Sequence, residues 1–137
     1  YQGNGFSIAF WEFRNTVGFA LAQIIWIGGA SAALNVGDGL GVPGFVNGIW
    51  NLVVYTYDQT TGDLSLSVNN SALSVLSNQG FFVADPGFAA SLTLSFFNNP
   101  GVTGPLIFDE LATFQSALTA ADIDFLWNAG AGKTFPF

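Results

Sequence analysis

The sequence contains no cysteine and no histidine, and it has only two basic residues, Arg14 and Lys133. Without cysteine there is no disulfide, thiolate metal site or cysteine nucleophile. Without histidine, every His-based triad, general base and zinc site is excluded. Two basic residues are too few to bind a phosphate backbone, so the sequence predicts no nucleic-acid partner.

Charge of either sign is scarce. Charged residues make up 8% of the 137 residues, against about 25% in an ordinary soluble domain. Nine acidic residues give a net charge of −7, and 50% of the chain is hydrophobic. Two interpretations fit the neutral surface that follows: an extracellular domain covered by Ser, Thr and Asn, or a surface covered by neighbouring subunits. The longest apolar run, 17–27, is shorter than the ~20 residues that span a bilayer.

A predicted β-hairpin, Gly48 to Asn70, organises the chain. Trp50 to Tyr57 is an apolar run rich in β-branched and aromatic residues, and 58–63 carries turn residues including a glycine. In the second strand, 64–68, leucine and valine alternate with serine, which predicts one buried face. We expect the matching face of the first strand to be formed by Trp50, Leu52 and Val54.

Further β-like runs lie on both sides of the hairpin, at residues 6–13, 19–27, 32–36, 72–76, 91–97 and 106–114. One late segment differs, because Thr119 and Asp122 form a capping box before apolar residues at helical spacing. We therefore expect a helix from Ala120 to about Asn128, ended by Gly130. The sequence predicts a single all-β domain, an antiparallel β-sandwich or jelly roll with one short C-terminal helix.

Two stretches resemble the laminin-G-like branch of the concanavalin A-like lectin/glucanase fold. The first contains Trp50, the Tyr57-Asp58 turn and a strand ending in Val-Asn, where Asn70 replaces the family's glycine. The second is 108–130, FDELATFQSALTAADIDFLWNAG, which is similar to the family's final strand, capped helix and Asn-Ala-Gly stop. The resemblance implies a concanavalin A-like jelly roll over 1–137.

Such domains carry further strands before the segment that matches 6–11, whereas five residues precede it here. The resemblance therefore predicts that N-terminal strands are lacking and that the sheet edge beside 6–13 is open. We expect an upstream segment of the same polypeptide or a neighbouring subunit to cover that edge. The chain begins at Tyr1 and shows no signal peptide, so we expect a processed protein or an excerpt of a longer one.

Catalysis on this fold would resemble the glucanases, which place acidic residues alternately along one strand. The only glutamates, Glu12 and Glu110, lie on separate predicted strands. Asp109 and Glu110 are adjacent, so on a regular strand they face opposite sides. The sequence predicts that the chain is not an enzyme.

Asp109 is the most informative carboxylate, since on strict alternation it shares a face with Ile107 and Leu111. Two roles stay open: it accepts backbone N–H groups, or it binds calcium together with loop carbonyls. If the chain binds an ion, calcium is expected, because only oxygen ligands are available.

Sugar binding would need exposed aromatic rings beside amide or carboxylate groups. The candidates are Trp11, Trp26, Phe81, Phe82, Asn98 and Asn99. Trp50 and Trp127 are expected in the core. Three functions stay open: a non-catalytic structural or interaction module on a cell or virion surface, a glycan-binding adhesion module, and a degenerate glycoside hydrolase.

Overall fold

The structure is a computed structural model, and it describes residues 5–14, 22–27, 36–37, 45–71, 74–76, 92–97 and 106–132. These ranges form eight strands and one α-helix followed by a 3-10 turn. The strands are β1 (Gly5–Arg14), β2 (Ala22–Ile27), β3 (Val36–Gly37), β4 (Trp50–Asp58), β5 (Asp63–Val68), β6 (Ser74–Leu76), β7 (Leu92–Phe97) and β8 (Leu106–Phe114). The helix is α1 (Ala120–Trp127), and η2 (Asn128–Gly130) follows it. The all-β prediction is confirmed.

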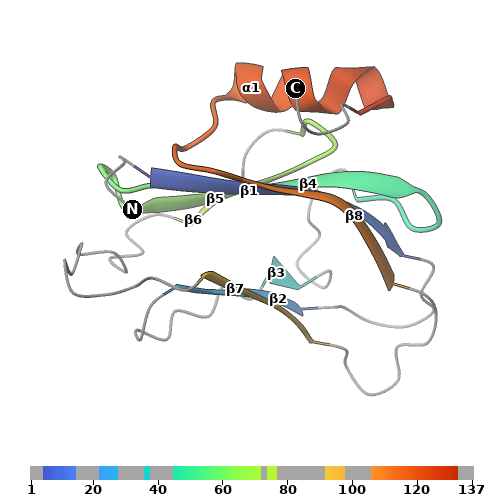
Figure 1. The fold of residues 1–137 in the computed structure, drawn as a ribbon, viewed down its shortest axis with the longest axis horizontal. Coiled ribbons are helices and arrows are strands. Elements are labelled where there is room, and N and C mark those ends of the chain that lie inside the picture. The colour runs from blue at the N-terminus through green and yellow to red at the C-terminus, as the bar shows by residue number, and fades with distance from the viewer. Residues whose placement is uncertain are drawn as a thin grey trace.

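The strands form two sheets, and every described pairing is antiparallel. One sheet has the order β6-β5-β4-β1-β8, and the other has the order β3-β2-β7. In Figure 1 the two sheets lie as separate layers, with α1 on the far side of the larger sheet. The larger sheet is therefore covered on both faces, which explains why β1 and β4 are apolar on both faces.

The central position of β1 contradicts the predicted open edge. β1 pairs with β4 from Gly5↔Asp58 to Phe13↔Trp50, and with β8 from Ser7↔Phe114 to Arg14↔Leu106. Both sides of β1 are thus occupied, because the late strand β8 returns to lie beside the first. In the described part of this sheet the edge strands are β6 and β8.

The larger sheet separates two hydrophobic clusters. The inner cluster faces the smaller sheet and comprises Phe6, Ile8, Phe10, Val53, Tyr55, Tyr57, Leu64, Leu66 and Val68. The outer cluster lies under α1 and comprises Ala9, Leu52, Val54, Ile123 and Leu126. Residues that alternate along β1 and β4 thus divide between two cores, as period-two geometry requires.

The facing set predicted for the hairpin was wrong. β5 pairs Leu64 with Tyr57, Leu66 with Tyr55 and Val68 with Val53. The other set of β4 side chains, which includes Leu52 and Val54, faces α1. Both sets are apolar, so alternation alone could not choose between them. The turn after Asp58 decides, because it pairs Asp58 with Asp63 and thereby sets the register.

The predicted boundaries are reproduced most closely late in the chain. β8 matches 106–114, and α1 begins with the predicted capping box of Thr119 and Asp122. The predicted C-cap was wrong, because Asn128 occupies that position in left-handed conformation, with φ 47° and ψ 48°. Asparagine tolerates this conformation, so it ends the helix before Gly130. The predicted strand residues 19–21, 32–35, 72–73 and 91 lie outside the described residues.

Candidate functional site

Four aromatic side chains form two ring contacts on the face of the larger sheet that carries α1. Trp11 stacks on Trp127 of the helix with ring centroids 5.7 Å apart and an angle of 23° between the planes. Phe13 contacts Trp50 with centroids also 5.7 Å apart. We call Trp11, Phe13, Trp50 and Trp127 the outer aromatic row.

Strand pairing extends this row sideways onto β8. Phe13 lies opposite Trp50 on β4 and opposite Ile107 on β8, while Trp11 lies opposite Asp109. Directly opposite residues in an antiparallel pair have Cβ atoms about 5 Å apart. Three strands therefore present Trp50, Phe13 and Ile107 side by side, with the Asp109 carboxyl at the next pair.

The exposed fractions show which part of the row is open. Trp50 is 40% exposed and Ile107 is 47% exposed, whereas Trp11, Phe13 and Trp127 are half-buried. The prediction that Trp50 belongs to the core was wrong. Trp50 is the first residue of β4, and the outer cluster includes that strand only from Leu52 onward. The open end of the row is thus formed by Trp50, Phe13 and Ile107.

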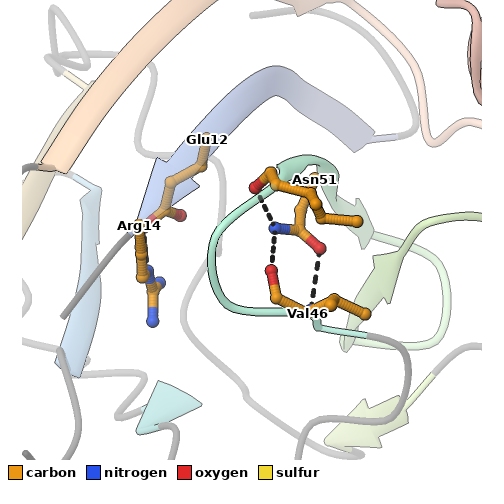
Figure 2. A network of polar contacts seen from close by, with 5 residues as sticks. Glu12, Arg14, Val46 and Asn51 are labelled. Carbon is orange, nitrogen blue, oxygen red and sulfur yellow. Dashed lines mark hydrogen bonds and ion pairs between the residues drawn. The ribbon is translucent and has the colours of Figure 1, made fainter. Parts of the chain in front are cut away.

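A buried amide holds the loop before Trp50. Figure 2 shows the Asn51 side chain turned back onto residues 46–49. Its Oδ1 accepts from Val46 N at 2.9 Å, and its Nδ2 donates to Val46 O at 2.8 Å and Ile49 O at 2.9 Å. Asn51 is 0% exposed, so its amide group is shielded from water, and its hydrogen bonds fix the loop that carries Trp50.

Three further hydrogen bonds tie this loop to the sheet. Asn69 Nδ2 donates to Asn51 Oδ1 at 2.7 Å, and Asn69 Oδ1 accepts from Leu52 N at 2.9 Å. Gly48 N donates to Arg14 O at 2.6 Å. The Asn51 amide thereby uses both donors and two acceptor positions. The loop is clamped to both β1 and the turn after β5.

Glu12 and Arg14 form an ion pair on the inner side of the same strand end, and Figure 2 shows their two side chains next to each other. Their side chains are 0% and 4% exposed, and the Arg14 guanidinium lies 4.3 Å from the centroid of the Phe45 ring. Burial of both charges requires that they neutralise each other. Glu12 is consequently a structural carboxylate.

A β-bulge interrupts β8 beside the row. Ala9 pairs with Ala112 but Trp11 pairs with Asp109, so Phe10 lies opposite two residues of β8. Glu110 has φ 51°, and its N–H donates to Asp109 Oδ1 at 2.9 Å. The prediction that Asp109 shares its face with Leu111 was wrong, since the extra residue places Ala112 on that face.

Asp109 is exposed and accepts a backbone N–H, which is one of its two predicted roles. Within the described ranges, no three acidic side chains gather into a group that could hold a metal ion. A calcium ion at Asp109 would therefore draw its remaining ligands from carbonyls and water. The calcium prediction stays open.

The structure places two of the predicted site residues together, since Trp11 and Asp109 are directly opposite. Trp26 lies in β2, but its side chain is not described. Phe81, Phe82, Asn98 and Asn99 lie outside the described residues. Sequence analysis missed Phe13, Ile107 and Asn51, because nothing local to them shows that β1 lies between β4 and β8.

Comparison of the sequence with models of known protein families finds no match, and comparison with curated proteins finds none either. The resemblance to laminin-G-like domains therefore remains a prediction. No helix in the described ranges is long and apolar enough to cross a membrane.

Proposed function

We propose that this chain is a non-catalytic interaction module on the outside of a cell or virion, where it packs in an assembly as a concanavalin A-like β-sandwich. The observation that carries the proposal is the edge strand β8. Three of its large apolar side chains are exposed: Ile107 at 47%, Phe108 at 38% and Leu111 at 64%. An apolar edge strand offers both backbone groups and side chains to a neighbouring chain.

The carboxylates favour a non-catalytic role. Glu12 is buried against Arg14, and Glu110 occupies the bulge of β8. Retaining glycosidases need two free carboxyl groups facing each other across the substrate, about 5 Å apart. A salt-bridged glutamate with an exposed fraction of 0% cannot serve as one of them. A degenerate glycoside hydrolase would lack this carboxyl pair and would have no detectable hydrolase activity.

The scarcity of charge supports packing in an assembly. Of the two basic residues in the chain, Arg14 is buried in its ion pair. Edge strands of free monomers are commonly protected by lysine. β8 contains no lysine, and its two charged residues, Asp109 and Glu110, lie beside the bulge and in it. The flanking parts of the edge are uncharged and suited to pairing.

Sedimentation of the full 137-residue chain tests the proposal. We expect the chain to self-associate in the micromolar range, and we expect Leu111→Lys to abolish this association. Phe125→Lys is the matched control, because Phe125 is 52% exposed on α1 and away from the edge. A wild-type chain that stays monomeric at all concentrations, or equal behaviour of the two variants, would contradict assembly through β8.

Glycan binding is the second candidate function, and the outer aromatic row is the observation that favours it. The row joins Trp11, predicted as a sugar-binding residue, to the exposed carboxylate of Asp109. Aromatic rings beside a fixed hydrogen-bonding group are the elements of a sugar site.

A further inference from the structure

We propose that the open end of the outer aromatic row binds a neutral carbohydrate, with a sugar ring lying on Trp50 and Phe13 and hydroxyl groups donating to Asp109. This inference rests on the second candidate function, and it adds the location of the site and the class of sugar.

The geometry suits an extended chain of sugar rings. Trp50, Phe13 and Ile107 lie side by side on β4, β1 and β8. Neighbouring strands are about 4.8 Å apart, so the three side chains span about 10 Å. This span exceeds one six-membered ring, and the ligand is therefore a disaccharide or longer. The apolar C–H face of each ring contacts the aromatic surface.

Asp109 supplies the polar contact. It lies one pair along from Ile107 on the same face, opposite Trp11. One carboxylate oxygen already accepts from Glu110 N at 2.9 Å, which orients the group. A carboxylate only accepts hydrogen bonds when ionised, so its partners on the ligand must be donors, such as sugar hydroxyls.

The site is held in place before the ligand arrives. Trp50 follows a loop whose Val46 and Ile49 backbone groups are bonded by the buried Asn51 amide. Phe13 lies on the central strand β1, which is paired on both sides. Holding the contact residues still reduces the entropy lost on binding.

The size of the open surface distinguishes a sugar from a protein partner. A tryptophan presents about 250 Å² when fully exposed, so Trp50 at 40% offers about 100 Å². With Ile107 at 47% and the half-buried Phe13, the total is about 250 Å². A stable protein interface needs about 800 Å² per partner. The row is too small for that role, but it is comparable to one face of a short oligosaccharide.

Charge selects the class of sugar. The chain carries a net charge of −7, and Arg14, the only basic residue in the described ranges, is buried in its ion pair with Glu12. A uronic or sulfated sugar would meet the Asp109 carboxylate with no cation beside it, and like charges at this range repel. The site therefore favours neutral sugars.

Titration of the full chain with cellohexaose, mannohexaose and oligogalacturonate, followed by tryptophan fluorescence and calorimetry, tests the inference. We expect at least one neutral hexasaccharide to bind, and the acidic one to bind more weakly. Trp50→Ala should weaken neutral binding about tenfold, which is ~1.4 kcal/mol. Asp109→Asn should reduce the difference in binding affinity between the neutral and the acidic sugars. Phe125→Ala, at an exposed ring outside the row, should bind like wild type.

Two results would overturn the inference: no binding of either neutral sugar at about 10 mM, or unchanged affinity in a folded Trp50→Ala. Should Trp50→Ala fail to fold, Ile107→Ser tests the same surface. Sugar binding that is unchanged in the folded variant refutes this location but leaves the glycan-binding function standing. Ile107 also belongs to the exposed edge of β8, so assembly is measured separately by sedimentation of Leu111→Lys, which leaves the outer aromatic row intact.

Discussion

Replacement of Asn51 by alanine tests whether one buried amide holds the loop and the open end of the aromatic row. The substitution removes four hydrogen bonds, two from Nδ2 and two to Oδ1. Each is worth about 1 kcal/mol net, and a buried group left without a partner costs about 1 to 3 kcal/mol. Val46 is 48% exposed, so water can reach part of the loop and recover some of this loss.

We expect Asn51→Ala to lower the free energy of unfolding by about 3 kcal/mol. Urea denaturation measures this loss, and the dependence of the free energy of unfolding on urea concentration should stay unchanged. Acrylamide should also quench the tryptophan fluorescence more strongly, because residues 46–49, which precede Trp50, lose their anchor. A loss below about 0.5 kcal/mol, within the range of an ordinary surface substitution, would refute the idea that this amide organises the loop.

Two further variants distinguish the effect of side-chain size at position 51 from the effect of its hydrogen bonds. Asn51→Asp keeps the size of the side chain but turns the donor facing Val46 O and Ile49 O into an acceptor. At neutral pH it should be at least as destabilising as Asn51→Ala, because it buries a charge, and acid should relieve part of the loss. Asn69→Ala combined with Asn51→Ala should fall short of additivity by about 1 kcal/mol, since the two amides share a bond.

Three further predictions concern the outer face. Hydrogen bonds from Thr119 hold the pKa of Asp122 below its ordinary value of 3.8, so the capping contribution is complete above that pH and is lost as the pH falls through the lower folded value. Melting curves of wild type and Asp122→Asn should therefore converge in acid, and a constant difference would contradict the capping role. Gly132→Ala should lower the free energy of unfolding by about 1 to 2 kcal/mol because of the positive φ at this position, and by more because Trp11 Cζ2 would lie 2.8 Å from the new Cβ. Gly48→Ala is the control, because Gly48 also has a positive φ, 83°, but no atom within 4 Å of the new Cβ. Equal losses in the two variants would exclude a contribution from the Trp11 contact. If Asp109 binds calcium, chelation should lower the melting temperature of wild type but not of Asp109→Asn, and no shift in wild type would leave Asp109 a structural acceptor.

Local patterns in the sequence were sufficient for the elements but not for their partners. The capping box of Thr119 and Asp122 and the extent of β8 follow from a few neighbouring residues, and both predictions are confirmed. The facing side of β4 could not be predicted, because both of its faces are apolar and only the turn register distinguishes them. The position of β1 was also missed, since its pairing with β8 joins residues about a hundred positions apart.

The site shows the same division. Asp109 and Trp11 were recognised by residue type, but their juxtaposition depends on strand order. The bulge at Glu110 has no local signal, because a non-glycine residue with φ 51° is held there by its surroundings. The Asn51 network was missed because an asparagine within a strand is not distinguished by sequence alone from one that faces solvent.

The pairing of β1 with β8 has a consequence for synthesis. Ser7 Oγ donates to Ser116 O and accepts from Leu118 N, both at 2.8 Å, so the start of β1 closes onto residues that leave the ribosome more than a hundred positions later. Until then one side of β1 has no partner, and such distant pairing slows folding. The edge of β1, which β8 closes in the finished fold, is therefore open in the nascent chain. Chaperones that shield apolar strands would meet this protein at β1, before β8 arrives.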